Sequence, residues 1–170
     1  TGPGGLRPPR TGELGELERH WCRSATEPEF ATALRCRGLE RSSVYRRIGD
    51  HYAAPVALEA LPSVLALAQT RTRPLTVTEV NAEVRSCHRA VPHARSWRGA
   101  QLAFCLGPCR QQWGCDRLGE VWRVRRPGLD GIETTLEVLD DRGELALVLG
   151  SESEPAWRRL LADSLYPKPV

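Results

Sequence analysis

The stretch LEVLDDRGELALVLGSESEPAWRRLLADSL, residues 136–165, carries the clearest structural pattern in the chain. Apolar residues alternate with polar ones on both sides of residues 140–143, DDRG, which predicts two antiparallel strands joined by a turn with Gly143 at a positive φ. Ser153 and Pro155 are typical of a helix start. One helical face then carries the apolar residues Trp157, Leu160, Leu161 and Leu165. The stretch therefore predicts a hairpin followed by an amphipathic helix.

Upstream of this stretch, the chain divides into a helical part and a strand-rich part. Residues 1–12 are rich in Gly, Pro and Arg and predict a flexible lead-in. Residues 13–70 predict three to five short helices, with Thr26 and Glu29 as a capping box and Gly38 as a stop signal. We also expect Pro55 to open one of these helices. From residue 75 onward the apolar period changes to two, so the fold class is α+β.

The order of elements in residues 136–165 resembles the C-terminal end of a pleckstrin-homology (PH) domain. Residues 94–106, ARSWRGAQLAFCL, are similar to that family's first inter-strand loop and second strand. The same architecture occurs in phosphotyrosine-binding (PTB) domains. The resemblance implies a short N-terminal helical segment followed, over residues 75–166, by a PH-like antiparallel β-barrel closed by the C-terminal helix. Trp157 would then plug one end of the barrel.

Basic side chains gather between residues 85 and 98. Because an arginine fork binds phosphate through paired hydrogen bonds, a loop that held them together would suit an anionic ligand such as an inositol phosphate headgroup. The candidate residues for this anionic-ligand site are Arg85, His88, Arg89, Arg95 and Arg98. Trp113 lies among polar residues, and we predict it as a partner-binding anchor. The alternative is that Trp113 packs across the mouth of the barrel.

Six cysteines leave two interpretations open, namely Cys22, Cys36, Cys87, Cys105, Cys109 and Cys115. We favour reduced thiols in an intracellular protein, because the apolar content suffices for a core without disulfides. The alternative is a secreted protein, with a Cys109–Cys115 disulfide as one example. The cysteines contain no C-x2-C pair, and together with His88 and His93 they do not predict a zinc site. We expect no metal and no cofactor.

Charge and motifs restrict the functional classes further. The 24 basic and 21 acidic residues give a net charge of +3, too mild for a general nucleic-acid binder. The sequence has no apolar run of about 18 residues, so no transmembrane span is expected. It also lacks the P-loop, G-x-S-x-G and H-E-x-x-H motifs, which argues against an enzyme. Because it contains no Met, we expect it to be part of a larger multidomain protein.

These observations predict a non-catalytic, protein-binding scaffold or adaptor module. Its partner would be another protein or other domains of the parent chain, with an anionic lipid headgroup as a second ligand. One alternative is a phosphoinositide-binding domain that recruits its parent to a membrane. Another is a secreted, disulfide-bonded ligand or binding protein. The favoured location is cytoplasmic, with association to a membrane if the lipid ligand applies.

Overall fold

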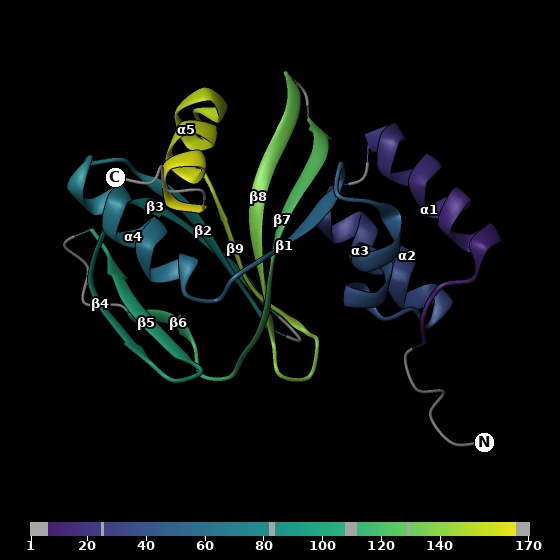
Figure 1. Ribbon diagram of the computed structural model, residues 1–170, viewed down its shortest axis with the longest axis horizontal. Helices are drawn as coiled ribbons and strands as arrows, with labels where there is room; N and C mark the ends of the chain where they lie inside the picture. The colour runs from purple at the N-terminus through teal and green to yellow at the C-terminus, as the bar shows by residue number, and fades with distance from the viewer. Residues whose placement is uncertain (1–6, 25, 82–83, 108–111, 129, 166–170) are drawn as a thin grey trace. The chain divides into compact units, whose positions relative to one another are not determined.

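The computed structural model describes the chain except residues 1–6, 25, 82–83, 108–111, 129 and 166–170 (Figure 1). The described residues form five helices, namely α1 (Thr11–Ser24), α2 (Glu27–Arg37), α3 (Arg41–Ile48), α4 (Ala60–Thr70) and α5 (Glu154–Leu165). They also form nine strands, namely β1 (Ala53–Val56), β2 (Leu75–Val80), β3 (Arg85–Ala90), β4 (Pro92–Arg98), β5 (Gln101–Leu106), β6 (Gln112–Cys115), β7 (Leu118–Gly128), β8 (Gly131–Asp140) and β9 (Leu145–Gly150). None of the helices among these residues is long and apolar enough to cross a membrane.

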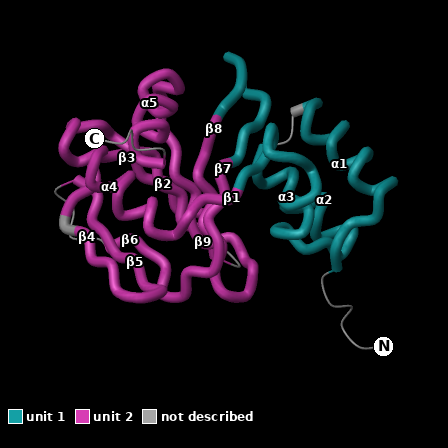
Figure 2. The backbone as a smooth tube through the Cα atoms, in the orientation of Figure 1, with its two compact units in different colours: residues 1–54, 124–133 teal, residues 55–123, 134–170 magenta. Residues whose placement is uncertain are grey.

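The chain forms two compact units (Figure 2). Unit 1 comprises residues 1–54 and 124–133, so it holds the first three helices and the far end of the β7–β8 hairpin. Unit 2 comprises residues 55–123 and 134–170. Helix α4 belongs to the strand-rich unit, and the far end of the β7–β8 hairpin belongs to the helical unit. The predicted division into residues 13–70 and 75–166 stays a prediction.

The strands form two open antiparallel sheets. The larger has the order β1-β7-β8-β9-β2-β3, and the smaller has the order β4-β5-β6. The α+β class is therefore confirmed, whereas the predicted PH-like barrel is wrong, because the described strands do not close into a barrel. Residues far apart in sequence meet in the larger sheet: Thr78 of β2 lies opposite Val148 of β9 on one side and opposite Cys87 of β3 on the other.

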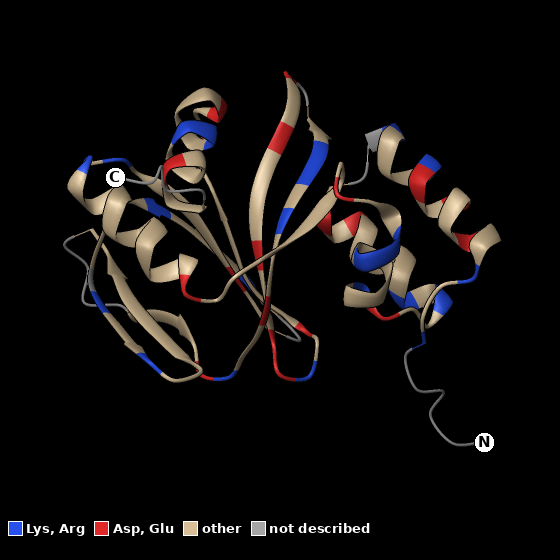
Figure 3. Ribbon diagram, in the orientation of Figure 1, with Lys and Arg blue, Asp and Glu red and all other residues tan. Residues whose placement is uncertain are grey.

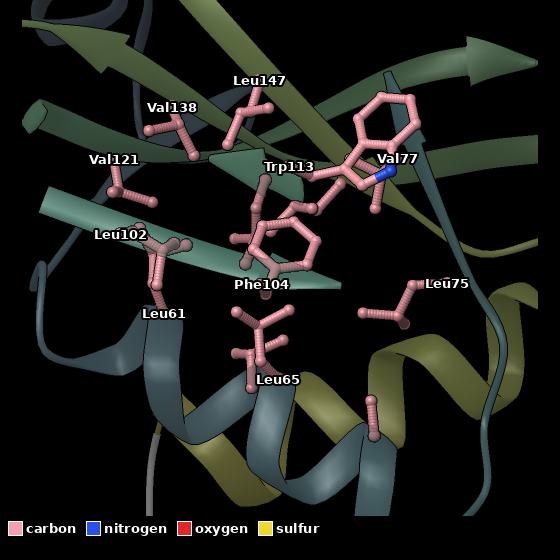
Figure 4. Close-up of a cluster of buried hydrophobic side chains, with 14 of the residues drawn as sticks. Leu61, Leu65, Leu75, Val77, Leu102, Phe104, Trp113, Val121, Val138 and Leu147 are labelled. Atoms are coloured by element: carbon pink, nitrogen blue, oxygen red, sulfur yellow. The ribbon is translucent and has the colours of Figure 1, made fainter. Parts of the chain in front are cut away.

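The core of unit 2 lies between its helices and its sheets. Figure 4 shows Leu61 and Leu65 of α4 rising toward Leu102 and Phe104 of β5. Strands of the larger sheet add further buried side chains, namely Leu75, Val77, Leu136, Val138, Leu147 and Leu149. Helix α5 contributes its apolar face, and the Nε1–H of Trp157 donates a hydrogen bond of 2.8 Å to the carbonyl oxygen of Thr134. The predicted hairpin and terminal amphipathic helix are both present.

Local signals in the sequence account for several element boundaries. Thr26 and Glu29 form the predicted capping box at the start of α2. Gly38 ends this helix in the left-handed conformation, with φ 61°, where a Cβ atom would be strained. Gly143 has φ 80° in the predicted turn between β8 and β9. These elements were predictable because each signal acts within a few residues of its own position.

Two predicted elements are wrong. Pro55 lies in the edge strand β1 instead of opening a helix, and edge strands tolerate proline because one side of their backbone donates to no neighbour. Residues 85–98, predicted to hold the ligand-binding loop, form strands β3 and β4. The side chains of β3 are mostly exposed, so this strand lacks the apolar alternation that reveals a half-buried strand.

Candidate functional site

The predicted anionic-ligand residues are distributed over both sheets. Arg85, His88 and Arg89 lie on β3 at the edge of the larger sheet, and Arg95 and Arg98 lie on β4 at the edge of the smaller one. Successive side chains of a strand point to opposite faces, so Arg85 and Arg89 share one face of β3 and His88 occupies the other. The five side chains therefore do not line one loop.

Contacts within unit 2 already engage several of these side chains. Arg89 Nη2 lies 3.2 Å from Glu152 Oε2, and Arg95 Nη1 donates to Gln69 Oε1 over 2.8 Å. The rings of His88 and Trp113 stack with centroids 6.0 Å apart and an interplanar angle of 19°. Trp113 is only 3% exposed, a burial that does not favour its predicted role as a partner anchor. The anionic-ligand and partner-binding roles of all these residues remain predictions.

Unit 2 carries an open polar pocket of about 350 Å³ beside the turn between β8 and β9. Its charged lining consists of Glu79, Asp116, Asp140, Asp141, Arg117 and Arg142. Asp140 Oδ1 accepts hydrogen bonds from the backbone N–H groups of Arg142 and Glu144, so this carboxylate shapes the turn. Four acidic against two basic side chains make the pocket acidic, which disfavours an anionic ligand.

Burial limits the chemistry of Cys115 in unit 2. Cys115 also lines this pocket, and burial, followed by the nearby acidic side chains, raises the pKa of its thiol. The thiolate, which is the reactive form, is therefore disfavoured. Cys115 is a free thiol in the structure. Cys109, its partner in the disulfide that the sequence left open, lies outside the described residues.

Unit 1 holds a cluster of polar side chains that we call the Tyr52 cluster, namely Glu18, Cys22, His51 and Tyr52. Tyr52 Oη donates a hydrogen bond of 3.0 Å to Glu18 Oε1 and lies 3.5 Å from Cys22 Sγ. The ring of His51 packs edge-on against that of Tyr52, with centroids 5.3 Å apart and an interplanar angle of 76°. Carboxylate, thiol, imidazole and phenol groups thus meet on one surface of unit 1.

Helix α1 and the turn before β1 place these groups. Glu18 and Cys22 are four residues apart on α1, so their side chains share a helix face. The turn at residues 49–52 is fixed because the backbone N–H of Tyr52 donates to the carbonyl oxygen of Gly49 over 3.0 Å. Gly49 has φ 107°, a conformation that other residues rarely adopt. This turn directs Tyr52 toward the helix, with His51 packed against its ring.

The core of unit 1 supports the cluster from behind. The Tyr52 ring lies 5.8 Å from that of the fully buried Trp21, and Trp21 Nε1 donates to the carbonyl oxygen of Arg125 over 2.7 Å. The guanidinium of Arg126 lies 4.7 Å from the Trp21 ring centroid and 5.5 Å from that of Phe30. Figure 3 shows basic and acidic positions interspersed along the helices of this unit.

The hydrogen bonds of Tyr52 determine its protonation. The hydrogen bond with Cys22, then that with Glu18, then burial raise the pKa of Tyr52 above its usual range. Its hydroxyl proton points to the Glu18 carboxylate, and the Cys22 thiol lies within hydrogen-bonding distance of the same oxygen. The phenol is therefore neutral at neutral pH and positions its neighbours through a fixed hydrogen-bond chain.

Sequence reasoning missed the Tyr52 cluster. Tyr52 lies 34 residues from Glu18 and 30 from Cys22, and His51 has no recognisable motif around it. One local signal was available: Glu18 and Cys22 are spaced four residues apart on α1, beside the buried face formed by Leu17 and Trp21.

No protein-family model and no curated protein sequence matches the chain. Solved structures do match. Holo-PhuS, a heme-binding protein from Pseudomonas aeruginosa, aligns with a TM-score of 0.76 at 23% identity over 100% of this chain and 51% of PhuS. ChuS, an Escherichia coli heme oxygenase, aligns with a TM-score of 0.76 at 21% identity over 96% of this chain and 50% of ChuS. The chain thus spans about half the length of either protein.

The heme-binding protein ChuX aligns with a TM-score of 0.60 at 11% identity, over 85% of this chain and 87% of ChuX. At these identities the likeness shows the fold. It overturns the resemblance to PH and PTB domains, because the similar structures are heme-binding or heme-degrading proteins. The predicted adaptor function with protein or lipid partners, and its alternatives, are wrong for the same reason. So is the exclusion of enzymes, because ChuS shares this fold.

Proposed function

We propose that the chain binds heme. The observation that carries this proposal is the likeness to PhuS and ChuS, which extends over 94–100% of the chain with TM-scores of 0.74–0.76. Heme, instead of a protein or a lipid, would then be the ligand. Both proteins are about twice as long as the part that matches this chain. Any activity that needs the full length of such a protein is therefore only proposed for this chain.

The donor groups of the Tyr52 cluster fit a heme. When bound, heme supplies an iron centre that takes an axial ligand from the protein, and His, Cys thiolate and Tyr all serve in that role. Cys22, His51 and Tyr52 provide these three types within one unit. Arg19, an exposed residue one helical turn before Cys22, can pair with a heme carboxylate.

The pocket in unit 2 does not fit a heme. Its four acidic side chains would repel the two carboxylates of the ligand, and two of them already serve the β8–β9 turn or pair with arginine: Asp140 binds backbone N–H groups and Asp141 lies 3.8 Å from Arg117. The charge of this pocket therefore supports a heme site elsewhere in the chain.

Titration of the chain with ferric heme tests the proposal. We expect saturable binding with a shift of the heme absorption band that free heme in the same buffer does not show. The proposal would be wrong if the absorption spectrum remained that of free heme at every ratio of heme to protein. The Asp140→Asn/Asp141→Asn double variant is a suitable control, because it alters the unit 2 pocket and should bind heme as the wild type does.

Oxidative heme degradation is a second candidate function. The likeness to ChuS over 96% of this chain favours it. The test is to supply the heme-loaded chain with oxygen and a reductant, and to follow the heme absorption band and the release of carbon monoxide. Heme loss without carbon monoxide would indicate nonenzymatic bleaching, and heme binding would then remain as the proposed function.

A cytoplasmic location is also part of the proposal, and the five described cysteines, all free thiols, agree with a reducing compartment.

A further inference from the structure

We propose that His51 is the axial ligand through which this chain holds heme iron, with Tyr52 as its positioning residue. The inference rests on the proposed heme binding and assigns the iron ligand to one side chain. The side chain that binds heme iron must be accessible to the heme and should already have a fixed orientation. A mobile side chain must be ordered when heme binds, and this cost weakens heme affinity. The four histidines of the chain differ in these two respects.

Two histidines are half-buried and lie in unit 2. His88 is half-buried and stacks on Trp113, and it projects from the same face of the sheet as Val77, which lies opposite it on β2. His93 is half-buried on β4, opposite Cys105 of β5. Coordination to a large planar ligand would require His88 to leave its packing on Trp113, and His93 is less exposed than the histidines of unit 1.

The remaining two histidines are exposed and lie in unit 1. Within the described residues, His20 on α1 makes no hydrogen bond, ion pair or ring contact that would fix its ring. His51, in contrast, packs against the Tyr52 ring and belongs to the turn closed by Gly49. His51 is therefore both accessible and oriented.

The surroundings of His51 are rigid. Tyr52 is held by Glu18 through its hydroxyl, by Trp21 through its ring, and by Arg125, whose backbone N–H donates to the Tyr52 carbonyl oxygen over 2.8 Å. The Tyr52 ring is held at these points, so it gives the His51 imidazole a fixed surface to pack against. Partners that orient a metal ligand contribute substantially to metal affinity.

The neighbouring donors are less suited to this role. Tyr52 Oη donates its proton to Glu18 Oε1 over 3.0 Å, so this hydroxyl is already engaged. Cys22 must lose a proton to become a thiolate ligand, whereas an imidazole coordinates in its neutral form. Cys22 is the rival ligand, and the experiment separates it from His51.

The test is a ferric heme titration of the full chain followed by absorption and electron paramagnetic resonance, which together report affinity and ligand type. The variants are His51→Ala, Cys22→Ser, Tyr52→Phe and, as the matched control, His20→Ala. We expect His51→Ala to weaken binding by more than about 100-fold, beyond the loss of roughly 10–100-fold that is typical of a supporting partner. We expect its altered spectrum to return to that of the wild type when free imidazole is added. The control should leave affinity and spectrum unchanged.

The outcomes distinguish the two proposals. If the wild type does not bind heme, the proposed function fails. If it binds and His51→Ala keeps both affinity and spectrum, heme binding stands and the assignment of His51 is wrong. A thiolate spectrum in the wild type that Cys22→Ser abolishes would also overturn the assignment. Unchanged circular dichroism confirms that each variant is folded.

Discussion

Replacing Arg126 by alanine should destabilise unit 1. Arg126 is 7% exposed, and its guanidinium lies over Trp21 and donates to Tyr45 Oη over 3.0 Å. A desolvated cation–π contact contributes about 2 kcal/mol. A hydrogen bond to a charged group adds about 1.5 kcal/mol net of desolvation. The two terms give an expected loss of about 3–4 kcal/mol in the free energy of unfolding.

Two further variants make this prediction specific. Arg126→Met keeps an unbranched stem between the rings and adds a sulfur–aromatic contact, so we expect a smaller loss of about 1–2 kcal/mol. Arg125→Ala is the matched control, because its hydrogen bonds to Tyr52 and Trp21 use backbone atoms that the substitution keeps. Its cost should stay below about 1 kcal/mol.

Equilibrium unfolding in urea, followed by near-ultraviolet circular dichroism, measures these differences by linear extrapolation. The reasoning would be refuted if Arg126→Ala cost less than about 1 kcal/mol, since neither contact would then contribute as magnitudes of this kind require. Equal losses for Arg126→Ala and Arg125→Ala would also refute it, because the effect would then belong to the strand and not to the buried guanidinium.

Three further predictions concern a strand, an ion pair and a thiol. Gly114→Ala should disrupt the pairing of β5 with β6, because a Cβ atom would clash with the carbonyl oxygen of Leu102; a melting temperature equal to that of the wild type would contradict this. Glu13 has a pKa of about 2, lowered first by its hydrogen bond with Arg7. Its stabilising contribution is therefore present above its ordinary pKa of 4.5 and is lost as the pH falls toward 2, so Glu13→Gln should flatten the acid unfolding curve in that interval. Cys115, whose pKa is raised, should be alkylated by iodoacetamide more slowly than the exposed cysteines, as peptide mass mapping over time would show.

The sequence predicts elements whose cause is local and misses those whose cause is distant. The capping box of Thr26 and Glu29 and the buried face of α5 depend on neighbours within one or two turns, so both are legible in the chain. Strand β3 is polar and exposed along most of its length, and only its pairing with β2 makes it a strand. Apolar periodicity cannot report such an element, and the arginines on it were therefore assigned to a loop.

The open sheets explain why the resemblance to a PH domain misled. A hairpin followed by a helix with a buried Trp157 occurs in both architectures, because any sheet with one apolar face is covered well by such a helix. What separates them is the pairing of β2 with β9, which joins residues about 70 positions apart, and the presence of a separate three-stranded sheet. The local pattern therefore predicted the hairpin and the helix correctly but wrongly predicted that the strands close into a barrel.

The candidate site and the stability of unit 1 share the same residues. Arg126 stacks on Trp21, Trp21 packs against Tyr52, and Tyr52 orients His51. Trp21 also binds the backbone of Arg125, which in turn binds Tyr52. The hairpin end that carries both arginines lies more than 70 residues from this turn in sequence, yet it fixes the ring that positions the proposed ligand. The hairpin end therefore supplies one of the contacts that hold Tyr52, beside those of Glu18 and Trp21.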